Sequence, residues 1–139
     1  MNPPSDNPPN NVSPSENVTC FIFDTRHYSI TEERVKYGAF LPDKGGERSV
    51  FRIIHLTNDH IKFIGDYVGR KRSRALLARG TLKVQNVTDT GLNFIPQGDP
   101  DIPLTLGRWH SVIIGWPTQK EDQRERAIDL ANTATLDSY

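Results

Sequence analysis

The chain has 139 residues, of which 17 are basic and 17 acidic, so its formal net charge at pH 7 is zero. Charged residues make up 24% of the sequence, an ordinary value for a folded domain of this size. This composition excludes a collagen, a coiled coil and a wholly disordered chain. The single cysteine, Cys20, excludes an intramolecular disulfide and a cysteine-rich zinc site.

Residues 1–17 differ in composition from the rest of the chain. They contain five prolines among asparagines and serines and almost no large apolar side chain. Such a segment cannot bury enough surface to offset its ordering entropy, so we predict a disordered tail before a single domain over residues 18–139. The tail lacks the pattern of a secretory signal, and no apolar stretch approaches the roughly 18 residues of a membrane span. A cytoplasmic protein without membrane contact is expected.

Three segments in the first part of the chain are predicted to be strands. Residues 18–24 are apolar on both faces, which is typical of a buried strand. Residues 35–41 alternate between apolar and polar side chains, and residues 49–56 form a second apolar run. Because proline and glycine between them favour a turn over residues 42–47, we expect these two strands to pair as a hairpin.

A helix and an alternating strand are predicted next. Thr57 or Asn58 can cap the first turn of the helix, Gly69 can end it, and its apolar residues recur at helical spacing. Residues 76–85 show the clearest alternation in the chain, with one apolar and one polar face. That pattern favours a strand of an antiparallel sheet with one solvated face.

The last part of the chain predicts two strands and a second helix. A short strand over residues 92–96 is followed by a long loop over residues 97–108 and a strand over residues 110–116. Thr118 and Glu121 have the spacing of a capping box for the final helix. The predicted order is β-β-β-α-β-β-β-α, an α+β fold with a mainly antiparallel sheet of five to six strands and two helices that can cover one face.

Motifs for nucleotide and metal chemistry are absent from the sequence. It contains no G-x-x-x-x-G-K-[ST], G-x-G-x-x-G or G-x-S-x-G pattern. The four histidines do not show the i, i+4 spacing of a metal site on one helix. Neither a cofactor nor a bound metal is therefore expected.

Candidate catalytic residues come from two places in the sequence. Arg26 and His27 follow the first buried strand, where an arginine can bind an anion and a histidine can move a proton. His110 begins the last predicted strand, and an enzyme would combine these three residues. Arg52 lies within an apolar strand and needs an acidic partner if it is buried, for which Asp24 or Glu33 is expected.

A basic cluster is the strongest local signal in the sequence. Five of the eleven residues 69–79 are basic and none is acidic. Arginine binds phosphate and carboxylate through two parallel hydrogen bonds, which suits a polyanion or an acidic partner. The candidate binding residues are Arg70, Lys71, Arg72, Arg74, Arg79 and Lys83.

The function expected first is that of a small cytoplasmic domain without enzymatic activity that binds a protein partner. The near-zero net charge and the scarcity of aromatic residues near the basic cluster place a protein ahead of a nucleic acid. The alternatives are a nucleic-acid-binding module that uses residues 70–83 and a small enzyme that uses Arg26, His27 and His110. The sequence sets neither the partner nor the oligomeric state.

Overall fold

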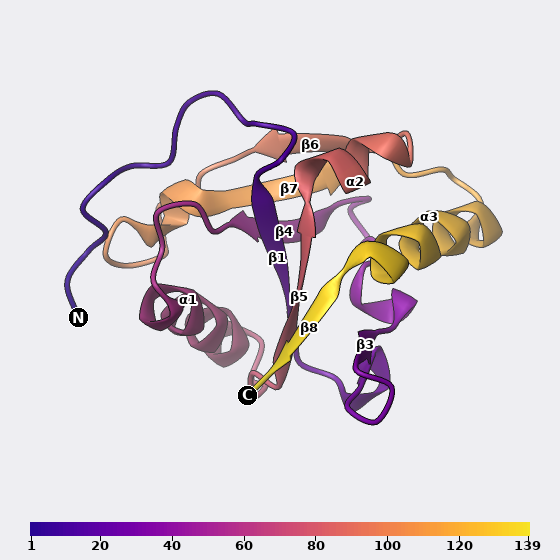
Figure 1. The fold of residues 1–139 in the computed structure, drawn as a ribbon, viewed down its shortest axis with the longest axis horizontal. Coiled ribbons are helices and arrows are strands. Elements are labelled where there is room, and N and C mark those ends of the chain that lie inside the picture. The colour runs from indigo at the N-terminus through magenta and orange to yellow at the C-terminus, as the bar shows by residue number, and fades with distance from the viewer.

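The computed structural model describes all 139 residues and places a six-stranded sheet at the centre of the molecule (Figure 1). The strands lie in the order β6-β7-β4-β1-β5-β8, and every neighbouring pair is antiparallel. Their bounds are β1 Asn17–Ile22, β4 Arg48–Arg52, β5 Ala78–Lys83, β6 Asn93–Pro96, β7 His110–Ile114 and β8 Thr135–Ser138. A separate ribbon pairs β2 (Tyr28–Ser29) with β3 (Arg34–Val35). The prediction of an α+β fold with a mainly antiparallel sheet is confirmed.

Three α-helices pack on the sheet, where the sequence predicted two. They are α1 Asn58–Lys71, α2 Val84–Asp89 and α3 Lys120–Thr133. α1 lies on one face of the sheet, and α2 and α3 lie on the other (Figure 1). The expectation that the two predicted helices share a face is wrong, because the central strands carry apolar side chains on both faces. None of the three helices has the length and apolar character needed to cross a membrane.

The hydrophobic core forms two clusters, one on each side of the sheet. The cluster on the α3 side contains sixteen buried residues, drawn from β1, β5, α2 and α3 among other segments. β1 contributes to both clusters because Cys20 and Phe21 are neighbours in a strand and point to opposite faces. The cluster on the α1 side consists of Phe21, Phe51, Ile61, Ile64, Ile102, Leu106 and Trp109.

Residues 35–41 do not form the predicted strand. β3 ends at Val35, and a 3-10 turn over Tyr37–Ala39 follows it. Ala39 and Phe40 are both fully buried, and two consecutive buried side chains fit a tight turn better than an alternating strand. The predicted hairpin is also wrong, since β4 pairs with β1 and β7 instead.

The alternating strand predicted over residues 76–85 is confirmed over β5 but ends earlier. Ala78, Gly80 and Leu82 are buried, as the alternation predicts. After β5 the chain turns into α2, whose buried Val84 and Val87 lie three residues apart and pack into the α3-side cluster. The chain also adds the edge strand β8 after α3, which the sequence analysis did not predict.

Arg52 is buried, and its acidic partner is neither Asp24 nor Glu33, as expected, but Glu16. Arg52 Nε donates to Glu16 Oε1 at 2.5 Å, and Nη2 donates to Oε2 at 3.0 Å. Arg52 Nη1 donates to the carbonyl oxygen of Pro9 at 2.7 Å. Residues from the predicted tail therefore satisfy a charge on the central strand β4.

The prediction of a disordered tail over residues 1–17 is not supported. Besides the contacts with Arg52, the segment bonds two other side chains of the domain. His60 Nε2 lies 2.9 Å from the carbonyl oxygen of Asn2, and Arg108 donates to the side chain of Asn7. Low apolar content predicted disorder, whereas the segment packs through these polar contacts and through Val12, which lies against the α3-side cluster.

Candidate functional site

The three candidate catalytic residues do not meet in one site. Arg26 and His27 line a pocket of about 480 Å³ beside the 3-10 turn Tyr37–Ala39 and α3. His110 lines another pocket, of about 170 Å³, beside α1. The two pockets share no lining residue, so the structure does not bring the three residues together in the one cleft that was predicted.

Asp24 holds Arg26 rather than His27 through its side chain. Its carboxylate accepts hydrogen bonds from the backbone N–H of Arg26 at 2.8 Å and from Arg26 Nη2 at 2.7 Å. These bonds, together with the guanidinium charge, hold the pKa of the Asp24 carboxyl well below its usual range. Asp24 is therefore ionised at neutral pH, and it offsets part of the positive charge around it.

The pH dependence of stability should report on His27. Burial lowers the pKa of His27 below its ordinary value of 6.5, although Asp24 acts in the opposite direction. The unfolded chain therefore takes up this proton first as the pH falls. The contribution of neutral His27 to folding stability is complete above the unfolded-state pKa of this residue. It is lost as the pH falls through the lower, folded-state pKa.

We expect the variant His27→Gln to lose less stability than the wild type between pH 7 and pH 5, because it has no such proton to bind. Urea unfolding at both pH values measures the difference in free energy of unfolding. An identical pH dependence in the two proteins would contradict this account.

The end of α1 gathers several of the predicted basic residues. Arg70 and Lys71 lie in the last helical turn, and Arg72 follows as the C-cap. The helix therefore ends two residues later than Gly69, the predicted stop. Gly69 is needed for another reason: a Cβ there would lie 2.6 Å from the carbonyl oxygen of Arg74, which folds back over the helix end.

Arg26 and Arg48 approach this helix end from other elements. Desolvation lowers the pKa of Arg72, and the charges of Arg48 and Arg74 lower it further. The charges of Arg26, Arg48 and Arg74 also lower the pKa of His27. We refer to the combined group as the basic surface, which consists of Arg26, Arg48, Arg70, Lys71, Arg72 and Arg74.

The other two predicted basic residues lie outside the basic surface. Arg79 and Lys83 share one face of β5, as predicted, and line a groove beside β8. Arg79 Nη2 lies 3.6 Å from Asp137 Oδ2, so its charge is partly compensated. Lys83 is four residues further along the strand, about 13 Å at the usual rise. The predicted patch is therefore two separate groups of charges.

A serine that the sequence analysis missed contacts His110 in the cavity beside α1. Ser49 and His110 both line this cavity, and His110 Nε2 lies 3.2 Å from Ser49 Oγ. His110 Nδ1 lies 2.6 Å from the carbonyl oxygen of Gln97. Ser49 and His110 are 61 positions apart, and the register that pairs Phe51 with His110 brings them together. No local sequence pattern marks this contact.

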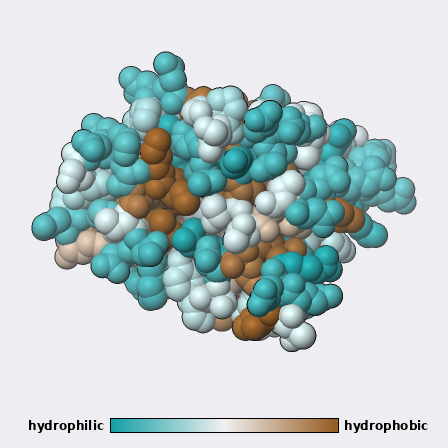
Figure 2. Space-filling model, in the orientation of Figure 1, coloured by the Kyte–Doolittle hydropathy of each residue, from teal (hydrophilic) through white to brown (hydrophobic).

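No group of three or more His, Cys, Asp or Glu side chains is placed to hold a metal ion. The large apolar side chains that are exposed come from scattered segments, and Figure 2 shows separate apolar patches between polar ones on the face in view.

Comparisons with family models, curated proteins and solved structures find no match to this chain. The basic surface and the Ser49–His110 cavity are the features that bear on function.

Proposed function

We propose that this chain is a domain that binds an acidic segment of a protein partner through the basic surface. The observation that supports this proposal is charge without an ion-pair partner. Arg48, Arg70, Lys71 and Arg72 form no ion pair. Arg48 and Arg74 repel the Arg72 guanidinium, and the carboxylate of Asp43 attracts it without pairing with it. Only Asp24 pairs with members of the basic surface, at 2.7 Å from Arg26 and 4.0 Å from Arg74. An acidic ligand would relieve this repulsion.

The chemistry of the basic surface favours carboxylates over nucleic-acid bases. Arginine is the main residue of the basic surface, and four of its arginines lie at the C-cap of α1 or outside this helix: Arg26, Arg48, Arg72 and Arg74. Guanidinium groups bind carboxylates through paired hydrogen bonds. Two aromatic rings nearby, those of Phe23 and Tyr67, already have a cation over one face. Arg72 lies over Phe23 at 5.3 Å, and Lys71 lies over Tyr67 at 5.6 Å. Open aromatic faces are what single-stranded nucleic acids use for stacking.

Charge reversal at the basic surface tests this proposal. We expect Arg72→Glu with Arg74→Glu to weaken the binding of a fluorescent peptide of ten glutamates at least tenfold, about 1.4 kcal/mol, because two attractive charges become repulsive. Fluorescence anisotropy at low and moderate salt measures the affinity. Lys83→Glu with Lys120→Glu is the matched control, since it makes the same charge change at two exposed lysines outside the basic surface, at the starts of α2 and α3.

The double variant in the basic surface and the control double variant together distinguish the possible results. Weakening by the Arg72 and Arg74 changes alone supports the proposal. Equal weakening by both pairs, or no binding of the peptide by the wild type, contradicts it. Salt-sensitive binding of a single-stranded RNA in preference to the peptide would also overturn it, in favour of the nucleic-acid alternative.

A further inference from the structure

We propose that Ser49 is the nucleophile and His110 the general base of a small esterase site in the cavity beside α1. Its substrate class is a short carboxylic ester that carries a second, anionic group. The inference rests on three observations: the Ser49–His110 contact, the carbonyl oxygen of Gln97 beside His110 Nδ1, and the charged side chains that line the cavity. It does not depend on the binding of an acidic partner.

The contacts of His110 determine which ring nitrogen can act as the base. The carbonyl oxygen of Gln97 only accepts hydrogen bonds, so His110 Nδ1, which lies 2.6 Å from it, carries the proton in the neutral ring. His110 Nε2 then has a free lone pair and accepts from the Ser49 hydroxyl at 3.2 Å. A nucleophile, a base and a group that orients the base are the parts of an activated serine. Here a backbone carbonyl takes the orienting position.

Strands hold these groups in place. Ser49 lies on β4 and His110 on β7, and the two strands pair antiparallel. The ring of His110 packs edge-on against Phe51, with 5.2 Å between the ring centroids. The backbone N–H of Gln97 donates to the carbonyl oxygen of His110 at 3.0 Å, so Gln97 is bound to His110 at two points. A site on rigid strands keeps the geometry that attack requires.

The lining of the cavity indicates the kind of substrate. Its volume of about 170 Å³ limits the acyl part to a few atoms. Two cations, Lys71 and Arg72, line it against one carboxylate, that of Asp99, which already accepts from the backbone N–H of Asp101 at 3.0 Å. The cationic N–H groups can stabilise an oxyanion or hold an anionic substituent. A larger cavity of about 570 Å³, lined by the loop over residues 98–108, shares Asp99 and Ile102 with it and leaves room for the rest of the ester.

The reaction needs no co-reactant other than water. Ser49 Oγ attacks the carbonyl carbon of the ester while its proton moves to His110 Nε2. The C–O bond to the leaving alcohol breaks, and the alcohol departs with that proton. Water then attacks the acyl-serine, its proton passes to His110 Nε2 and from there to Ser49 Oγ, and the carboxylic acid is released.

Hydrolysis of a chromogenic ester by the full chain tests the proposal. With the 4-nitrophenyl monoester of succinic acid, we expect Ser49→Ala and His110→Gln each to lower kcat/KM at least 100-fold. Lys71→Met should raise KM for this ester while it leaves KM for 4-nitrophenyl acetate nearly unchanged. The control is Ser111→Ala, because Ser111 is buried next to His110 on β7 but lines none of these cavities.

Covalent labelling of the wild-type chain tests the nucleophile without relying on a variant that could fail to fold. A fluorophosphonate should add once to the wild type, with Ser49 as the modified residue in peptide mapping, and should not add to Ser49→Ala. Ser49→Ala should keep the circular dichroism spectrum and the urea unfolding midpoint of the wild type, which shows that it is folded. Absence of labelling, labelling at another residue, or hydrolysis that survives in Ser49→Ala would overturn the proposal.

Discussion

Glu16→Ala is expected to destabilise the folded chain by about 3–5 kcal/mol, the usual cost of removing one partner of a buried ion pair. The side chains of Arg52 and Glu16 are 3% and 2% exposed, so the variant leaves the guanidinium buried without its counter-charge. The Arg52 guanidinium would keep the carbonyl oxygen of Pro9 as its only hydrogen-bond acceptor. Urea unfolding followed by circular dichroism measures the change in free energy of unfolding.

Two further variants distinguish a buried charge from a general effect of mutation. Glu32→Ala removes the partner of Arg34 in an exposed ion pair, in which both side chains are more than half exposed. We expect it to cost less than about 1 kcal/mol. Replacing both members of the buried pair, with Glu16→Leu and Arg52→Met, should recover most of the stability lost in Glu16→Ala. A loss below about 1 kcal/mol in Glu16→Ala would show that residues 1–16 do not pack on the sheet.

Trp109→Ala is expected to cost about 3–5 kcal/mol, the range measured for large aromatic residues in cores. Trp109 is fully buried in the α1-side cluster, and its indole N–H donates to the carbonyl oxygen of Ile54 at 2.8 Å. The variant loses apolar contacts, leaves a cavity and removes a hydrogen bond from a carbonyl group. Because Trp109 directly precedes His110, we also expect fluorophosphonate labelling of Ser49 to weaken.

The second tryptophan provides the control for this prediction. Trp116 is half-buried and packs against the α3-side cluster. We therefore expect Trp116→Ala to lose less stability than Trp109→Ala in the same urea titrations, and to leave the labelling of Ser49 unchanged. Equal losses in the two variants would contradict the assignment of Trp109 to the centre of the smaller cluster.

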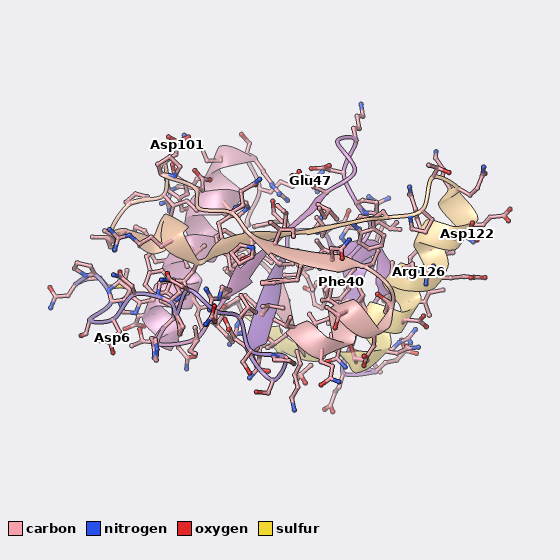
Figure 3. The ribbon with its side chains drawn as sticks, turned by 90° about the horizontal axis from the view of Figure 1, so that it is seen from above. Asp6, Phe40, Glu47, Asp101, Asp122 and Arg126 are labelled. Atoms are coloured by element: carbon pink, nitrogen blue, oxygen red, sulfur yellow. The ribbon has the colours of Figure 1, made fainter.

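Parts of the fold could be predicted wherever the pattern of side chains follows burial. β5 is the clearest case, because one apolar face meets the core and one polar face meets solvent. α1 and α3 were predicted from their helical spacing, although the side-chain cap predicted for α3 is absent and Gln119 is its N-cap. α3 lies at one end of the molecule, where Asp122 and Arg126 mark it in Figure 3.

Elements that depend on distant contacts could not be predicted. β8 forms only because β5 offers it a free edge, and the turn at Ala39 and Phe40 exists because both side chains enter the α3-side cluster. The pairing of Arg52 with Glu16 crosses 36 positions from a segment whose composition predicts disorder. Local patterns carry no information about such partners.

In the candidate site too, features set by local sequence could be predicted and features set by distant contacts could not. The basic run was visible in the sequence because charge is a local property, and four of its six predicted members belong to the basic surface. Arg48 was missed because only strand pairing brings the start of β4 toward the end of α1. His110 was identified as a candidate residue, but its contact Ser49 was not, since the register of β4 and β7 determines that contact.

The most direct test of the proposed function is a ¹H–¹⁵N NMR titration of the full chain with the ten-glutamate peptide at low and moderate salt. The account predicts salt-sensitive shifts at the amides of Arg26 and Arg48 and across residues 69–74, with little change on α3. No shifts, or shifts centred on the edge strands β6 or β8, would contradict binding through the basic surface.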